Sequence, residues 1–297
     1  MEFIPAKSIV TKSKNAYWFG SEYNMNIYKG CCHGCIYCDS RSECYRIDDF
    51  DTVRAKDNAV EIIEHELQRK KIKGVIATGA MSDPYNPFEK EYELTRRALK
   101  VVDQFQFGVA IDTKSDLIVR DIDLLTKIKR YSPVLVKITI TTADDELAKK
   151  IEPNVCLSSE RFFALRRLSE AGIYCGILLM PLLPFINDTE ENIRQIVHLA
   201  KINGARFIFP AFGVTLRQNQ RIYFYEKLNE KFPGITEKYI ERYNNTYSCQ
   251  SPYAKTLSKI FVQLCKENRI IYKMEDIVKT SRDGYYENPP SFFDVLS

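Results

Sequence analysis

The sequence of 297 residues has no apolar run that could span a lipid bilayer. Its longest apolar stretch, residues 172–185, is too short and is interrupted by prolines. The first residues, Met1 to Pro5, are not a basic segment followed by an apolar one, so we expect no secretory signal peptide. Internal repeats and low-complexity segments are also missing. We therefore expect a globular chain that does not contact a membrane.

The chain has only a small excess of positive charge, since its formal net charge is +4. This value permits contact with nucleic acid but does not argue for it. Apolar residues make up 45% of the chain, which is ordinary for a globular protein. The length fits one large α/β domain or two smaller ones, and it is sufficient to bury a sizeable core.

Cysteine, in contrast, is plentiful. There are nine cysteines, an odd number, and four of them lie between residues 31 and 38. Such crowding is not the pattern of a secreted disulfide framework. It favours a reducing, cytoplasmic setting and metal binding.

Three of these residues, Cys31, Cys35 and Cys38, form a Cys-x3-Cys-x2-Cys array. Zinc sites and Fe–S clusters usually have four protein ligands. Three cysteines would leave one iron of a [4Fe–4S] cluster open, and an open metal position is where chemistry can occur. Cys32 could instead complete a four-cysteine zinc site, Cys32 or Cys44 could complete the cluster of an electron carrier, or the group could be ordinary buried thiols.

Short β-type runs alternate with helical runs over residues 23–215. Six such units predict a parallel sheet with right-handed crossovers, and six units in place of eight predict an open, partial (β/α)6 TIM-type barrel. We expect strands at Asn24–Tyr28, Gly74–Thr78, Gly108–Asp112, Val134–Thr141, Tyr174–Met180 and Ala205–Ala211. We expect helices at 58–70, 92–105, 121–129, 158–171 and 188–203.

Polar residues follow most of these strands. The chemistry of barrels of this type lies at the carboxyl ends of the strands, so residues that follow different strands meet at one mouth. The cysteine array follows the first predicted strand. The other residues expected at this mouth are Ser82, Asp83, Lys114, Thr141, Thr142 and Asn187.

The remainder of the chain has a different character. Residues 1–22 are expected to be an irregular lead-in. Residues 216–297 are expected to form a helical extension packed on the barrel, with helices at 216–232, 236–243 and 254–268 and a tail over the last fifteen residues. Basic and aromatic residues that could hold nucleic acid alternate on the first of these helices, although they could equally form a solvated face; they are Arg217, Arg221, Tyr223, Tyr225 and Lys227.

The segment Asn26-x-Tyr28-x-Gly30-Cys31-x-His33-x-Cys35-x-Tyr37-Cys38 resembles the signature of the radical S-adenosylmethionine (SAM) enzymes. Its longer form is similar to the branch of spore photoproduct lyase and DNA repair photolyase-like proteins, and the resemblance extends from about residue 20 to about residue 215. It implies a partial barrel and a [4Fe–4S] cluster on the three cysteines. It also implies reductive cleavage of SAM to a 5′-deoxyadenosyl radical, with electrons from a partner such as flavodoxin or ferredoxin.

The same resemblance implies a set of SAM-binding residues, each with a simpler alternative. Tyr37 matches an aromatic that packs near adenine, but could be loop packing. Gly79 and Ala80 match a segment of small residues beside the SAM amino group. Lys114 matches a residue near the SAM carboxylate or ribose, but could be a solvated charge. The complete set is Tyr37, Gly79, Ala80, Ser82, Lys114 and Thr141.

The sequence departs from spore photoproduct lyase at Ala80, where that enzyme has a hydrogen-donating cysteine. Thymine-dimer reversal is therefore not implied, and the substrate stays open, with nucleic acid among the candidates. No catalytic residue is predicted. Two other classes of function remain: a four-cysteine zinc protein that binds nucleic acid, and a non-catalytic Fe–S electron carrier.

Overall fold

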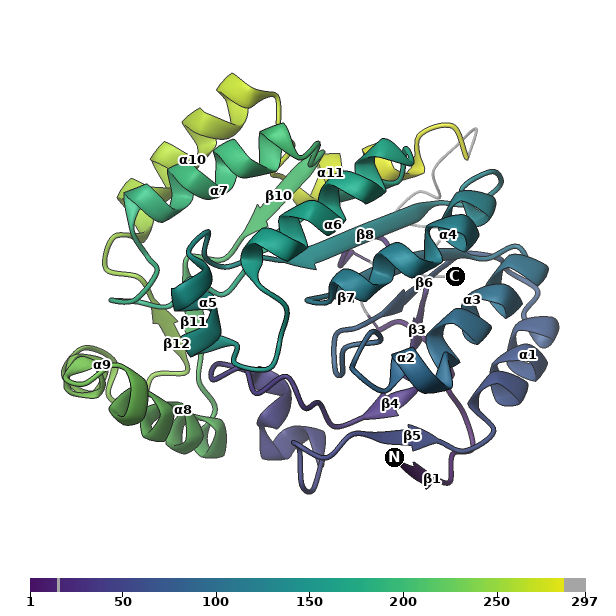
Figure 1. The fold of residues 1–297 in the computed structure, drawn as a ribbon, viewed down its shortest axis with the longest axis horizontal. Helices are drawn as coiled ribbons and strands as arrows, with labels where there is room; N and C mark the ends of the chain where they lie inside the picture. The colour runs from purple at the N-terminus through teal and green to yellow at the C-terminus, as the bar shows by residue number, and fades with distance from the viewer. Residues whose placement is uncertain (15–16, 286–297) are drawn as a thin grey trace.

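The computed structural model describes residues 1–14 and 17–285. Its centre is a seven-stranded sheet with the order β10-β9-β8-β7-β6-β3-β2, in which all pairs are parallel except β2 with β3. The strands are β2 (Val10–Lys12), β3 (Tyr23–Met25), β6 (Val75–Thr78), β7 (Gly108–Thr113), β8 (Val134–Thr139), β9 (Tyr174–Leu179) and β10 (Phe207–Pro210). The expected α/β partial barrel is confirmed (Figure 1).

Five longer helices cover the outer face of the sheet. Alternation along each strand puts one set of side chains on this face, for example Val109 and Ile111 of β7, which join the largest buried apolar cluster. The helices are α1 (Ala59–Arg69), α3 (Leu94–Gln104), α4 (Ile122–Ile128), α6 (Ser158–Glu170) and α7 (Glu190–Ile202). Short helices α2 (Glu89–Tyr92), η3 (Asp116–Asp121) and α5 (Asp145–Ile151) lie in the loops that follow strands.

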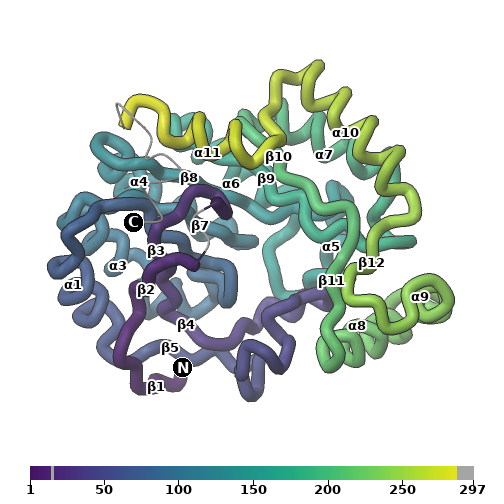
Figure 2. Tube along the Cα trace, turned by 180° about the vertical axis from the view of Figure 1, so that it is seen from behind, coloured from purple at the N-terminus to yellow at the C-terminus, as the bar shows by residue number. Residues whose placement is uncertain are grey.

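The inner face has its own buried cluster. Ala110 of β7, Leu135 of β8 and Phe207 of β10 pack there against Phe19 and against Met274 of helix α11 (Met274–Arg282). Figure 2 shows α11 and the chain that connects β2 to β3 on this side of the sheet. Helix α11 was not predicted from the sequence.

The N-terminal part differs from expectation in two ways. Residues 1–22 are not irregular, because they contain β1 (Glu2–Ile4) and β2. The predicted first strand, Asn24–Tyr28, is in fact two strands in different sheets: β3 belongs to the barrel, and β4 (Tyr28–Lys29) pairs with β5 (Arg54–Lys56) in a three-stranded sheet completed by β1. The chain therefore leaves the barrel sheet just before the cysteine array.

The C-terminal part contains more than helices. Strand β11 (Gly213–Thr215) pairs with β12 (Ser248–Gln250), and around them lie α8 (Gln218–Lys231), α9 (Ile235–Tyr243) and α10 (Ala254–Asn268). Helix α10 lies beside α7 in both views (Figures 1 and 2). The division at residue 215 stays a prediction, and residues 286–297 of the predicted tail lie outside the described residues. Within the described ranges, no helix has both the length and the apolar character needed to cross a bilayer.

Candidate functional site

The three cysteines of the array lie on one loop, residues 30–38, which we call the cysteine loop. It runs from the end of β4 to a turn of 3-10 helix, η1 (Asp39–Arg41). Ser82, just beyond β6, donates a hydrogen bond to the carbonyl oxygen of Gly30 at 2.5 Å. The amide of Ile36 donates to the carbonyl oxygen of Ile151 at 3.0 Å. The loop is therefore fixed to the carboxyl edge of the barrel, as the sequence predicted.

Gly30 is required by this path of the chain. It has a φ of +81°, and a Cβ atom on it would lie 2.2 Å from the carbonyl oxygen of Thr52. Any other residue would both strain the backbone and collide with the chain just before β5. The backbone of the loop is thereby packed directly on the segment before β5, which also accepts a hydrogen bond from the Cys31 amide through Phe50.

All nine cysteines lie within the described residues, and all are free thiols. Cys31 and Cys35 are buried and Cys38 is partly buried. Cys38 and Cys31 lie close enough to Cys35 for their charges to add to the effect of burial, which raises the pKa of Cys35. Burial raises the pKa of Cys35 and of Cys38, whereas the nearby Lys114 ammonium opposes that effect at both residues.

His33 distinguishes Cys31 from the other two. Burial disfavours ionisation of Cys31, but a hydrogen bond and the charge from His33 outweigh it, so the pKa of this thiol lies below its ordinary value. Nδ1 of His33 lies 3.6 Å from Oδ2 of Asp83, and the side chain is only 4% exposed. Cys32 has no such partner, and burial raises its pKa to about 11.

In residues 1–14 and 17–285, no group of three or more His, Cys, Asp or Glu side chains is arranged to hold one metal ion. The residues on the cysteine loop are nevertheless of the type that binds metal. Soft thiolates on one loop, with a lysine ammonium beside them, fit a thiolate-bound Fe–S cluster.

Tyr37 lies over a buried ion pair. Its hydroxyl donates a hydrogen bond to Oε1 of Glu152, and Oε2 of Glu152 lies 2.6 Å from Nη1 of Arg161. Arg161 also donates to the carbonyl oxygen of Thr139 at the end of β8. Both charged side chains are 1% exposed. This pair therefore braces the cysteine loop against the end of β8.

Lys114 is directed toward the cysteine loop. Its ammonium lies 5.8 Å from the centre of the Tyr37 ring. Burial lowers the pKa of Lys114, but the negative charges of Cys35, Glu152, Cys38 and Asp83 outweigh it, so the pKa is raised. Lys114 is therefore a cation held among anions, not a solvated surface charge.

Asp83 organises the neighbouring strand ends. It accepts hydrogen bonds from the hydroxyl of Thr113 and from the amides of Lys114 and Tyr85, at distances of 2.7 to 2.9 Å. This carboxylate thus joins the ends of β6 and β7 and also faces His33. Its visible role is structural.

The segment after β6 passes very close to β7. Gly79 has a φ of +103°, and a Cβ atom on it would lie 1.9 Å from the carbonyl oxygen of Asp112. Ala80 is exposed, and its carbonyl oxygen accepts a hydrogen bond from Ser40. Ser82 uses its hydrogen to hold Gly30. Contact of these three residues with SAM stays a prediction.

Thr141 lies two residues beyond the end of β8 and has a hydroxyl that the fold does not use. Its Oγ1 is buried and has no hydrogen-bond partner among the described residues. Its carbonyl oxygen accepts from the amides of Asn187 and Asn192, both at 2.9 Å. Asn187 therefore holds the loop in place, whereas the hydroxyl of Thr141 is available to a ligand.

The predicted nucleic-acid patch is not one surface. Arg221 is 8% exposed and donates hydrogen bonds to the carbonyl oxygens of Leu216, Asn244 and Thr246. Its role is to hold the end of α9 against the start of α8. Arg217 lies 3.3 Å from Asp39. Helical periodicity turns Arg221 inward, so it does not share one face with the other residues of the predicted patch, and binding of nucleic acid stays a prediction.

An ion pair inside the barrel was not predicted. Nζ of Lys137 on β8 lies 2.6 Å from Oδ1 of Asp112 on β7, and Lys137 also lies 4.3 Å from the centre of the Phe19 ring. Lys137 is 1% exposed. A polar residue at an inward position of an otherwise apolar strand could have indicated this ion pair. We missed it because the other residues of β8 are mostly apolar.

Fold and site together define a partial α/β barrel with a three-cysteine loop, a partly buried lysine and a threonine hydroxyl that has no partner within the described residues. The family model of the radical SAM superfamily matches residues 25–200. The chain therefore belongs to the radical SAM superfamily.

Relatives extend this similarity over most of the chain. An uncharacterized protein of Mycobacterium tuberculosis is 28% identical over 271 residues, covering 89% of this chain and 79% of the relative. An uncharacterized protein of Methanocaldococcus jannaschii is 37% identical over 179 residues, covering 59% of this chain and 66% of the relative. A solved structure of spore photoproduct lyase complexed with dinucleoside spore photoproduct superposes with a TM-score of 0.63 at 14% identity, covering 89% of this chain and 79% of that one. At that identity, the likeness concerns the fold.

Proposed function

We propose that this protein is a radical SAM enzyme whose Cys31, Cys35 and Cys38 hold a [4Fe–4S] cluster. When bound, the cluster and SAM supply one-electron cleavage of the sulfonium, giving a 5′-deoxyadenosyl radical that abstracts hydrogen from a substrate. The observation that carries the proposal is the position of the three thiols, which share one loop at the carboxyl edge of a partial barrel. Membership of the radical SAM superfamily supports it.

The protein's own residues prepare this site in three ways. The ammonium of Lys114 offsets negative charge at Cys35 and Cys38 and is suitably charged to meet the carboxylate of SAM. Tyr37, held by Glu152, offers a fixed aromatic face. The Oγ1 atom of Thr141 offers an unsatisfied hydroxyl that can bond to a sugar hydroxyl.

Backbone approach is a fourth contribution. Gly79 lets the loop after β6 lie against the end of β7, so its peptide groups line the mouth. We assign SAM contact to Tyr37, Gly79, Ala80, Ser82, Lys114 and Thr141.

Two alternatives make different demands on the cysteines. A zinc protein needs Cys32 as a fourth ligand, yet burial raises the pKa of this thiol. An electron carrier needs a fourth cysteine for its cluster. Cys44, one candidate, is exposed.

Anaerobic reconstitution tests the proposal. We expect about four irons and sulfides per chain and formation of 5′-deoxyadenosine from SAM after reduction with dithionite. Cys35→Ala should lose both the cluster and the cleavage, and Cys44→Ala, a matched change outside the loop, should keep both. Stoichiometric zinc without SAM cleavage would replace the proposal by the zinc protein. Four irons without cleavage would replace it by the carrier.

A further inference from the structure

The ammonium of Lys114 is unpaired within the described part of the chain. It forms neither an ion pair nor a hydrogen bond with any described residue, and it lies 5.8 Å from the centre of the Tyr37 ring. Three carboxylates, those of Glu152, Asp83 and Asp112, lie close enough for their charges to interact with it. A cation that is partly withdrawn from water usually pairs with such a neighbour, so its isolation needs a physical cause.

The cause is that each of the three carboxylates is occupied by another partner. Glu152 lies 2.6 Å from Nη1 of Arg161. Asp83 accepts three hydrogen bonds at the ends of β6 and β7. Asp112 lies 2.6 Å from Nζ of Lys137. A carboxylate that is already compensated attracts a second cation less, so this ammonium stays available to an anion from outside the chain.

Asp112 is the carboxylate that shares a strand with Lys114. Side chains alternate along β7, so positions 110, 112 and 114 lie on one side, and Ala110 belongs to the inner cluster of the barrel. Two residues along a strand are roughly 6.6 Å apart, a distance that a flexible lysine side chain can cover. Burial raises the pKa of Asp112, and the charges of Lys137 and Lys114 both oppose that effect. The two lysines therefore compete for one carboxylate.

Lys137 is placed to win this competition. It lies directly opposite Asp112 in the register of β7 and β8, and it is 1% exposed. Its Nζ lies 4.3 Å from the centre of the Phe19 ring. Among the described residues, Asp112 is the only carboxylate that forms an ion pair with it. Its neighbour on β9, Gly176, has no side chain that could offer another partner.

We propose that Lys137 is a positioning residue, which holds Asp112 and thereby keeps the ammonium of Lys114 available for the carboxylate of SAM. The inference rests on the proposed function, because that function supplies the anionic ligand. Lys137 acts through Asp112 and does not itself touch the ligand. A buried ion pair adds little to stability on its own, so a role in ligand binding accounts for two charges kept inside the barrel.

The test separates positioning from support of the fold. Calorimetry measures the Kd for SAM of the reconstituted protein and its variants. K137M releases Asp112 to attract Lys114, so the Kd should rise about tenfold or more, the loss of one charge-assisted hydrogen bond. D112N removes the competitor, so its Kd should equal that of the wild type. K137M/D112N should restore the wild-type value. A pair that only supports the fold would make the two single variants equally harmful, because each leaves one buried charge alone.

A second readout needs neither cluster nor SAM. In a crystal structure of the K137M apoprotein, Nζ of Lys114 should lie at ion-pair distance from Asp112. K137R retains the charge and should keep both the position of Lys114 and the affinity for SAM. If K137M does not fold, K137Q replaces it, because its amide can still donate a hydrogen bond to Asp112. The rise in Kd should then be smaller but in the same direction.

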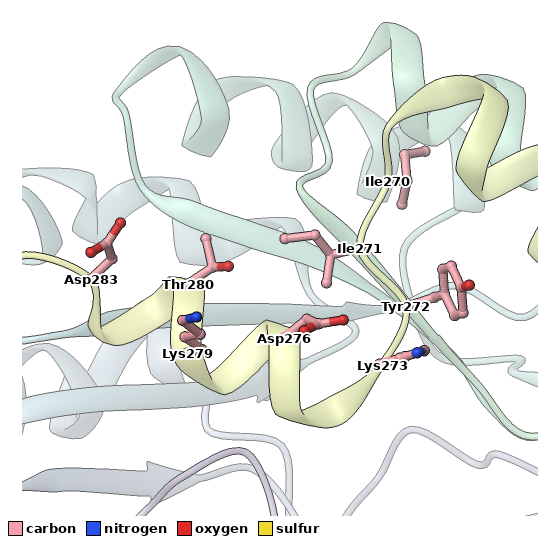
Figure 3. A pocket seen from close by; sticks show the side chains of 8 residues that line it. All are labelled: Ile270, Ile271, Tyr272, Lys273, Asp276, Lys279, Thr280 and Asp283. Carbon is pink, nitrogen blue, oxygen red and sulfur yellow. The ribbon is translucent and has the colours of Figure 1, made fainter. Parts of the chain in front are cut away.

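Helix α11 provides the matched controls. Lys279 and Asp276 are exposed on this helix and line a groove of about 540 Å³ (Figure 3). K279M and D276N make the same changes of net charge as K137M and D112N. Both controls should leave the Kd for SAM unchanged, since neither residue pairs with Asp112.

Every other outcome counts against the inference. Equal rises in Kd for K137M and D112N would leave the pair with a structural role only. An unchanged Kd for K137M, or a Lys114 that keeps its place in that variant, would overturn the positioning role. A rise in K279M as large as in K137M would attribute the effect to net charge. Reconstituted wild-type protein that binds no SAM would instead defeat the proposed function, and this inference with it.

Discussion

The hydroxyl of Tyr37 donates a hydrogen bond to Glu152, a residue 115 positions later in the chain. This bond connects the cysteine loop to the buried Glu152–Arg161 ion pair, which in turn holds the end of β8. Loop, ion pair and strand therefore form one continuous support beneath the proposed cluster. Because a hydrogen bond to a buried charge is worth more than one between neutral groups, this support should be measurable.

Removing one partner of the ion pair should be costly. Arg161→Met keeps the length of the side chain but leaves Glu152 buried and uncompensated, so we expect a loss of about 3 to 5 kcal/mol in the free energy of unfolding. Chemical denaturation measures it. Lys149→Met, which breaks an exposed pair with Glu146, is the control and should change stability little. Equal effects of the two variants would mean that the buried pair has no special role.

Stability should fall in acid partly through Glu152. Burial alone raises the pKa of Glu152, but the charges of Arg161 and Lys114 outweigh it and hold the pKa below its ordinary value of 4.5. A lowered pKa in the folded state adds stability that is present above the ordinary value and is lost as the pH falls through the lowered one.

Glu152→Gln should therefore be less stable than the wild type at neutral pH, and its stability should decline less steeply in acid. Unfolding by denaturant at a series of pH values between about 3 and 7 measures both slopes. Glu146→Gln, at an exposed position, serves as the reference. A decline as steep in Glu152→Gln as in the wild type would show that other carboxylates account for the acid sensitivity.

Gly79 should not tolerate a side chain. In Gly79→Ala the new Cβ would meet the carbonyl oxygen of Asp112, so the loop after β6 must move, and we expect weaker SAM binding as well as lower stability. Gly234→Ala is a matched change, because Gly234 has a φ of +82° with no atom within 4 Å of the added Cβ.

The two alanine variants separate backbone strain from collision. Gly234→Ala reports the strain alone, about 1 kcal/mol, and Gly79→Ala should cost at least about 2 kcal/mol more because it adds overpacking. Thermal unfolding and SAM titration of the reconstituted proteins provide the two readouts. Similar losses for both variants would show that the close approach at Asp112 relaxes easily.

The hydroxyl of Thr141 should matter to the ligand more than to the fold. Thr141→Val removes a buried oxygen that has no partner in the described part of the chain, so the apoprotein should be as stable as the wild type or more stable. SAM affinity should fall about five- to tenfold, the loss of one hydrogen bond. Thr142→Val should instead lower the stability and leave the SAM affinity unchanged, because the hydroxyl of Thr142 accepts a hydrogen bond from the amide of Asp144. Calorimetry measures the SAM affinity of each variant. An unchanged affinity in Thr141→Val would show that the hydroxyl of Thr141 does not contact SAM.

The parts of this fold that repeat were predictable, and those that depend on distant partners were not. Six alternating units produced a correct barrel because apolar periodicity is a local property of the sequence. The split of Asn24–Tyr28 between two sheets was missed because β4 has two residues and is defined by its pairing with Arg54 and Ala55. Edge strands this short leave no periodic signal.

The site shows the same division. The cysteine loop was evident because its three cysteines lie close together in the sequence. Ser82 was recognised as a residue at the mouth, but its bond to Gly30, 52 positions away, depends on the folded chain. Arg221 was assigned to a surface because sequence cannot show which face of α8 packs against the protein. Lys137 was overlooked because its partner Asp112 lies on another strand.

The contact between Tyr37 and Gln220 has a consequence for how the protein is made. The two residues are 183 positions apart, so a ribosome that adds roughly 5 to 20 residues per second needs on the order of ten to forty seconds between them. Throughout that interval the cysteine loop has left the ribosome without the helix that later covers it. Metal delivered during synthesis would meet a cysteine loop that α8 does not yet contact, whereas metal delivered to the finished protein would meet the loop with α8 already bonded to it. The order of translation thus gives the nascent chain a period in which this loop lacks one of its final supports.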